Sequence, residues 1–163
     1  QMMQYSDIIF GDQNEWEIAS GVPHIPFEAL DADYEIAKEA YLEYFRKMHQ
    51  LFPKCKKMLM AVRNQIASSH HTLSGLLYDA VEDQLYTTRI YDIEPIVDPM
   101  GVGDAFIAAY IHAHQKWGDK NQYCLDFSLS ASAIKNTVPG DQNLVTEEEI
   151  INNMTSSGGR IQR

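Results

Sequence analysis

The sequence predicts an α/β domain whose mixed sheet combines parallel strands with an antiparallel hairpin. Three observations indicate this class: a strand–helix–strand pattern opens the chain, two alternating apolar segments follow, and several helices come last. The chain has 163 residues, 45% of them apolar and 22% charged, which is enough for one compact globular domain. No internal repeat and no linker divides it.

The first half of the chain is predicted to hold two buried strands and two helices. Residues 6–11 form a short apolar run that ends in glycine, as a buried strand does. A capped short helix over 12–21 and a proline-containing loop over 22–30 come next. Apolar residues recur at intervals of three and four over 31–52, which predicts one long amphipathic helix. A second buried strand is predicted over 57–62.

The second half is predicted to hold a hairpin, a further strand and three helices. The hairpin strands 72–80 and 84–90 alternate around a short turn, and 91–98 adds a third antiparallel strand. Two apolar helices cover about 101–117 and 121–136. A third, shorter helix follows a Thr-Glu-Glu-Glu capping box, and the last residues of the chain resemble a frayed tail.

Acidic residues outnumber basic ones, 23 to 13, which gives the chain a net charge of −10. This field repels a phosphate backbone, so the sequence argues against general nucleic-acid binding. A small anionic ligand is compatible with it, because backbone N–H groups in a local nest can hold an anion. The two cysteines match no metal spacing, and no apolar run is long enough for a membrane helix. We therefore expect a reduced, cytoplasmic protein that contacts neither nucleic acid nor membrane.

The most informative segment for chemistry is the turn Gly101-Val102-Gly103-Asp104, which precedes an apolar helix. Glycines let a ligand approach the backbone, and the free N–H groups and dipole of a helix start attract an anion. An aspartate in that turn could take the proton of a hydroxyl that attacks a phosphoryl group. By itself the motif favours a simpler interpretation, a tight turn with a helix cap.

Four segments together resemble the ribokinase-like (PfkB) sugar kinases. Residues 98–106 resemble the Asp-Thr-x-Gly-Ala-Gly-Asp-x-Phe signature of that family, and 14–17 resemble its Asn-x-x-Glu motif. Residues 61–75 and 135–145 look like the corresponding segments of 2-keto-3-deoxygluconate kinases. The resemblance covers nearly the whole chain and implies a three-layer α/β/α fold, of which this chain would be the C-terminal part.

The resemblance implies roles for the residues of the 101–104 turn. Asp104 would be the catalytic base that deprotonates the sugar hydroxyl. The backbone N–H groups of Gly101, Val102 and Gly103 would form the anion hole for the transferred γ-phosphoryl group. Pro99 and Val102 depart from the usual threonine and alanine, but both keep the backbone small or rigid.

The resemblance also implies ligand-binding residues outside that turn. Asn14 and Glu17 would help to organise Mg²⁺ through water. Asp98, with carbonyls around Gly140, resembles the loop that holds a monovalent cation such as K⁺ in the family. The adenine would lie near the helix that contains Ser128. The nucleotide would contact Arg63, Ser68, Ser132 and Asn136.

The implied activity is ATP-dependent phosphorylation of a sugar acid, 2-keto-3-deoxygluconate, to its 6-phosphate. Members of the family are much longer, so residues 1–163 would be the nucleotide-binding C-terminal portion of a sugar kinase domain. The N-terminal portion, with the sugar contacts and the lid, would be absent, and we expect this chain alone to be inactive. The parent is expected to form a homodimer. Two alternatives stay open: a kinase of another sugar, of the fructose or ribose type, and a non-catalytic nucleotide-binding or oligomerisation fragment.

Overall fold

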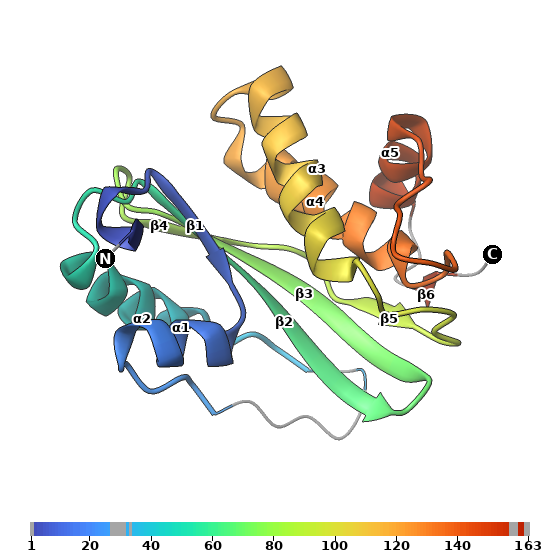
Figure 1. The fold of residues 1–163 in the computed structure, drawn as a ribbon, viewed down its shortest axis with the longest axis horizontal. Coiled ribbons are helices and arrows are strands. Elements are labelled where there is room, and N and C mark those ends of the chain that lie inside the picture. The colour runs from blue at the N-terminus through green and yellow to red at the C-terminus, as the bar shows by residue number, and fades with distance from the viewer. Residues whose placement is uncertain (1, 27–31, 33, 157–159, 162–163) are drawn as a thin grey trace.

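A computed structural model describes residues 2–26, 32, 34–156 and 160–161 and shows a six-stranded mixed sheet with helices on both faces (Figure 1). The strand order is β1-β2-β3-β5-β6, and β4 pairs with β3 beside this path. Helices α1 and α2 pack on one face of the sheet, while α3, α4 and α5 pack on the other. The predicted three-layer α/β/α class is confirmed.

The strands combine two parallel pairs with an antiparallel centre. Their bounds are β1 Ile8–Gly11, β2 Lys57–Ala67, β3 His70–Asp79, β4 Gln84–Thr87, β5 Tyr91–Ile93 and β6 Arg160–Ile161. β1 lies parallel to β2, and β5 lies parallel to β6, whereas β3 runs antiparallel to β2, β4 and β5. β2 and β3 extend further than predicted and form a long hairpin of their own, and β6 falls in the segment predicted as a tail.

Four of the helices begin and end close to the predicted positions, one starts later, and the short 3₁₀ helix near the start of the chain was not predicted. Their bounds are η1 Met2–Tyr5, α1 Gln13–Ser20, α2 Lys38–Leu51, α3 Val102–Trp117, α4 Asn121–Lys135 and α5 Glu147–Thr155. Helix α2 starts later than predicted, after an Ala37 that provides no side-chain cap. Part of the predicted start, 27–31 and 33, lies outside the described residues. No helix in the described part of the chain is long and apolar enough to cross a membrane.

Two features bring the sequence-predicted site residues toward one end of the sheet. Gly11, the last residue of β1, pairs with Met60, so β2 continues past the end of β1 and α1 starts beside it. On the opposite face, α4 fixes the start of α3. The Ser132 hydroxyl donates to the Val102 carbonyl at 3.0 Å, and the Ser128 hydroxyl donates to the Phe106 carbonyl at 2.5 Å. The first turn of α3 is therefore held against a buried helix.

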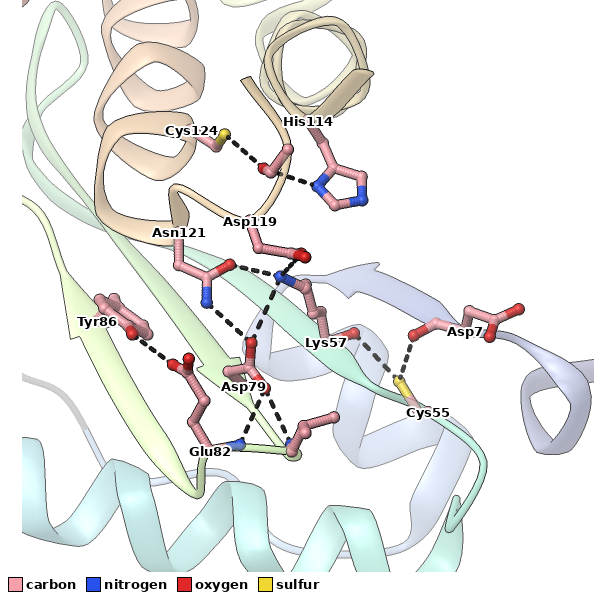
Figure 2. A network of polar contacts seen from close by, with 12 residues as sticks. Asp7, Cys55, Lys57, Asp79, Glu82, Tyr86, His114, Asp119, Asn121 and Cys124 are labelled. Atoms are coloured by element: carbon pink, nitrogen blue, oxygen red, sulfur yellow. Dashed lines mark hydrogen bonds and ion pairs between the residues drawn. The ribbon is translucent and has the colours of Figure 1, made fainter. Parts of the chain in front are cut away.

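A buried charged network ties the other end of the sheet to the connection between α3 and α4 (Figure 2). The Lys57 ammonium lies 2.8 Å from Asp119 Oδ1, 2.5 Å from Asn121 Oδ1 and 3.4 Å from Asp79 Oδ2. Asp79 also accepts from the Asn121 amide at 2.8 Å. The Lys57 and Asp79 side chains are 8% and 6% exposed, so neither charge is solvated by water alone. Each charge is compensated by the network, which locks β2, β3 and α4 together.

Acid is expected to weaken this network. Burial alone would raise the pKa of Asp79, but hydrogen bonds from Asn121 and from two backbone amides, with the Lys57 charge, lower it below its usual 3.8. A carboxyl group whose folded pKa is depressed stabilises the fold above its unfolded pKa and loses that contribution as pH falls through the folded value. Urea unfolding from pH 6 to pH 2 measures the free energy of unfolding of the native chain and of Asp79→Asn. The difference between the two free energies should become smaller below about pH 4. A difference that does not change with pH would contradict this account.

Candidate active site

The first turn of α3 presents free backbone N–H groups at the predicted anion-binding position. Gly101 is the N-cap residue with φ of 74°, and no side chain caps this helix. The first amide bonded within the helix is that of Ala105, which donates to the Gly101 carbonyl at 2.9 Å. The N–H groups of Val102, Gly103 and Asp104 therefore have no helical acceptor, and together with the dipole they form an anion site.

The two glycines of the turn are required for different reasons. A Cβ on Gly101 would lie 2.2 Å from the Asp141 carbonyl oxygen, and the positive φ also disfavours any other residue there. A Cβ on Gly103 would meet nothing within 4 Å. The fold itself therefore requires Gly101 but not Gly103. The open space over Gly103 is what a ligand approaching the helix N-terminus needs.

Asp104 borders two cavities, one on each side of the turn. The larger cavity, about 430 Å³, lies over α3 and α5. Its apolar walls are formed by Ala105, Ala108, Ala109, Phe127, Val145 and Ile150, and its polar lining by Gly101, Asp104, His112, Asp141, Asn143 and Glu147. Asp104 is exposed, and within the described residues its carboxylate makes no hydrogen bond or ion pair. The carboxylate is therefore available to a ligand.

The second cavity, about 290 Å³, connects Asp104 and Gly103 with the ends of β1 and β2. It is also lined by Phe10, Gly11, Asp12, Glu15, Ala61, Phe106 and Ile107. A third, smaller cavity of about 190 Å³ shares Asp12 and Ala61 with it and contains Asn14 and Arg63. The structure therefore places Arg63 and Asn14 beside each other, one cavity away from Asp104.

Asp98 fastens two loops together next to the turn. Its carboxylate accepts from the Met100 amide at 2.9 Å and from the Gly140 amide at 2.8 Å. The backbone amides of Val97 and Asp98 both donate to the Asn136 carbonyl, at 2.8 and 3.2 Å. The Met100 and Gly140 hydrogen bonds lower the pKa of Asp98, with a smaller contribution from the Lys135 charge. The carboxylate is thus ionised and holds the 98–101 loop in place.

Four residues predicted to lie at or near the nucleotide do not line these cavities. Ser132 and Asn136 are buried, and their side chains bond to the α3 and α4 backbone rather than to a surface. Ser128 is buried in the same way. Ser68 is exposed in the turn between β2 and β3, five residues or about 16 Å of strand beyond Arg63. Direct nucleotide contacts by these residues stay predictions that the geometry does not favour.

The residues predicted to organise Mg²⁺ do not form a cluster of metal ligands in the described part of the chain. Glu17 accepts from the backbone and side chain of His24, and these contacts lower its pKa. Among the described residues no group of three or more histidine, cysteine, aspartate or glutamate side chains could hold a metal ion. The indirect role of Asn14 and Glu17 at a magnesium ion stays a prediction.

The fold and this site can be compared with solved structures. A 2-dehydro-3-deoxygluconokinase from Thermotoga maritima superposes with a TM-score of 0.80 and 26% identity over 95% of this chain. The chain has the fold of the ribokinase-like (PfkB) kinases. A PfkB family carbohydrate kinase from Listeria grayi gives a TM-score of 0.76 at 24% identity, again over 95% of the chain. Arabidopsis thaliana ribokinase, complexed with ribose and ATP, gives a TM-score of 0.69 at 21% identity over 96% of the chain.

This ribokinase-like chain spans 43% of the length of each of those three kinases, and it corresponds to their C-terminal part. No protein-family model and no curated protein sequence matches the chain. All three solved structures are kinases of this fold, so the likeness of this chain to them rests on shape together with modest identity.

The structure adds residues to the candidate site for which the sequence analysis predicted no role. Asp141 and Asn143, in the loop after α4, line the larger cavity, and the Asp141 carbonyl packs on Gly101. Ala105 and Ala108 provide a smooth helix face beside Asp104. Small residues at positions 105, 108 and 109 are visible in the sequence, but they equally suit close helix packing. Asp141 and Asn143 belong to the 135–145 segment that carries the family resemblance, but no role was predicted for either of them.

Proposed function

We propose that this chain is the nucleotide-binding part of an ATP-dependent sugar-acid kinase, which phosphorylates 2-keto-3-deoxygluconate to its 6-phosphate. The observation that carries the proposal is the first turn of α3, where free N–H groups, an open Gly103 and an Asp104 carboxylate without a partner among the described residues meet two cavities. The likeness to the Thermotoga enzyme supports the choice of substrate. The sugar-binding and lid portion would be supplied by the rest of the kinase.

In the proposed reaction Asp104 accepts the proton of the sugar's primary hydroxyl. That oxygen attacks the γ-phosphorus of ATP, the bond to the β-phosphate oxygen breaks, and ADP leaves. The N–H groups of the α3 turn stabilise the charge that spreads over the transferred phosphoryl oxygens. The work required of the protein is mainly positioning and electrostatic stabilisation, which backbone amides on a fixed helix can supply.

The larger cavity suits the nucleoside of ATP. Its alanine, phenylalanine, valine and isoleucine walls can pack a planar base, and its polar rim leads to the helix N-terminus where phosphates bind. Arg63 and Asn14 lie on the other side of the turn, within a cavity that could receive phosphate oxygens. When bound, Mg²⁺ would neutralise charge on the phosphates, with Asn14 and Glu17 ordering its water ligands.

A kinase of another sugar is the second candidate function. The Arabidopsis ribokinase, which was solved in complex with ribose and ATP, shares the fold at 21% identity, and no sugar contact has been assigned in the described part of this chain. A non-catalytic nucleotide-binding or oligomerisation fragment is the third. Assaying the complete kinase with 2-keto-3-deoxygluconate, fructose and ribose decides among the sugars. Homodimerisation of the parent and a cytoplasmic location stay predictions.

Calorimetric titration of this chain with Mg-ADP tests the nucleotide site. We expect the native chain to bind and Gly103→Val to lose binding at least tenfold, because the valine fills the open space over the anion hole without touching the fold. Gly101→Val should instead lower the unfolding temperature, because its side chain meets the Asp141 backbone. Gln115→Val, at the far end of α3, controls for a β-branched residue in the helix. Equal binding by native chain and Gly103→Val would remove the nucleotide from this turn.

A further inference from the structure

Helix α4 ends on a buried cation. Lys135, its last residue, is 0% exposed, and its ammonium donates to the Val138 carbonyl at 3.0 Å. A buried ammonium is costly unless dipoles or charges nearby compensate it. Lysine at a helix C-terminus gains from the helix dipole, but that gain does not require burial. The complete burial of Lys135 therefore needs a reason in its surroundings.

Those surroundings are the two loops that carry the anion-binding turn. Val138 belongs to the loop that follows α4, and two residues later the Gly140 amide donates to the Asp98 carboxylate. Asp98 in turn holds the Met100 amide, directly before Gly101. The charge of Lys135 contributes to the low pKa of Asp98, so the ammonium and the carboxylate lie in one electrostatic environment. Lys135 is thus the positive partner at the junction of both loops.

This junction is where the family resemblance places a monovalent cation, and the positive charge that Lys135 already brings there disfavours one. Both Asp98 oxygens already accept amide N–H bonds, at 2.9 and 2.8 Å. The Val138 carbonyl already accepts the Lys135 ammonium. The Lys135 side chain, which is covalently part of the protein, already supplies the single positive charge that such an ion would bring. A potassium ion would add a second positive charge beside the first.

We propose that the Lys135 ammonium is a built-in substitute for the monovalent cation, so that the two loops and the anion-binding turn hold their shape without potassium. The inference deepens the proposed function, since it concerns the same phosphate-binding turn. Lys135 acts here as a positioning residue, because it supports the turn through Val138 and Asp98 and does not itself line a described cavity.

Thermal unfolding tests the proposal without any nucleotide, so its outcome is separate from that of the proposed function. The native chain, Lys135→Ala and Lys120→Ala are unfolded in potassium chloride and in tetramethylammonium chloride at equal ionic strength. Lys120 is an exposed lysine at the opposite end of α4 and serves as the matched control. The native chain and Lys120→Ala should give the same unfolding temperature in both salts. The unfolding temperature of Lys135→Ala should be lower than that of the native chain by about 5 °C or more in tetramethylammonium chloride. In potassium chloride this difference should be at most half as large.

Either of two results overturns the proposal. The first is a native chain that is stabilised by potassium relative to tetramethylammonium, since an ion would then bind despite Lys135. The second is a Lys135→Ala chain that is as indifferent to the salt as the native one. If Lys135→Ala does not fold, Lys135→Met keeps the volume and removes the charge. Its unfolding temperature should then be lower than that of the native chain in both salts, and an unfolding temperature equal to the native one would take the place of the second result.

Discussion

An Asp104→Asn kinase is expected to transfer phosphate about 10²–10⁴-fold more slowly than the native enzyme, the range that a positioned general base contributes. Asparagine keeps the size of the side chain but cannot take the proton of the attacking hydroxyl. Asp104 is exposed and lies in the first helical turn, so the change should leave the fold intact. Loss of one negative charge beside the phosphates should leave Mg-ADP affinity equal or slightly higher.

The rate is measured with ATP and 2-keto-3-deoxygluconate in the complete kinase of which this chain would be the nucleotide-binding part, and the affinity by calorimetry. Glu148→Gln, an exposed acidic residue in α5, removes the same charge outside the cavities and should keep the native rate. Turnover of Asp104→Asn within a fewfold of the native enzyme would eliminate Asp104 as the base. A variant that loses both turnover and Mg-ADP binding would indicate a structural role instead.

Lys57→Met is expected to destabilise the chain by about 3–5 kcal/mol, the cost of removing one partner of a buried ion pair. The substitution leaves the Asp79 carboxylate buried without its cation, and it releases the Asn121 and Asp119 oxygens that the ammonium now joins (Figure 2). The neighbouring Lys56 offers a matched control because it forms an exposed ion pair with Asp7. The Lys56 and Asp7 side chains are 63% and 70% exposed.

Urea unfolding of the native chain, Lys57→Met and Lys56→Met at pH 7 measures both effects. Lys56→Met should leave the midpoint unchanged, because water and salt already screen an exposed pair. A Lys57→Met midpoint equal to that of Lys56→Met would show that the buried network contributes specificity to the fold but not stability.

Local sequence signals predicted the parts of the fold whose hydrogen bonds are local. The predicted cap of α1 and the predicted capping box of α5 both form, with reciprocal bonds between Asp12 and Glu15 and between Thr146 and Glu149. Each depends on residues three positions apart, so the sequence contains the whole contact. The 101–104 turn was predicted for the same reason, because a helix N-terminus carries its own donors.

Features that depend on tertiary contacts were not visible. The helix predicted from residue 31 begins only at Lys38, since apolar periodicity indicates a face but does not fix where capping begins the helix. Ser132 and Asn136 were predicted to bind the nucleotide. Inside the core, however, their side chains donate hydrogen bonds to backbone carbonyls of α3 and α4. The burial of Lys135 is equally invisible in sequence, because a lysine at a helix end is normally solvated.

The position of Asp104 between two cavities has a stereochemical consequence. On the proposed function, ATP approaches the α3 turn from the larger cavity, and the sugar hydroxyl approaches from the side of β1 and β2. The incoming and departing oxygens then lie on opposite faces of the phosphorus. Each transfer would invert the configuration at phosphorus, so a γ-phosphate made chiral by isotopic labelling would be transferred with inverted configuration. On the proposed function, one such displacement would complete the cycle without a phosphorylated form of the protein.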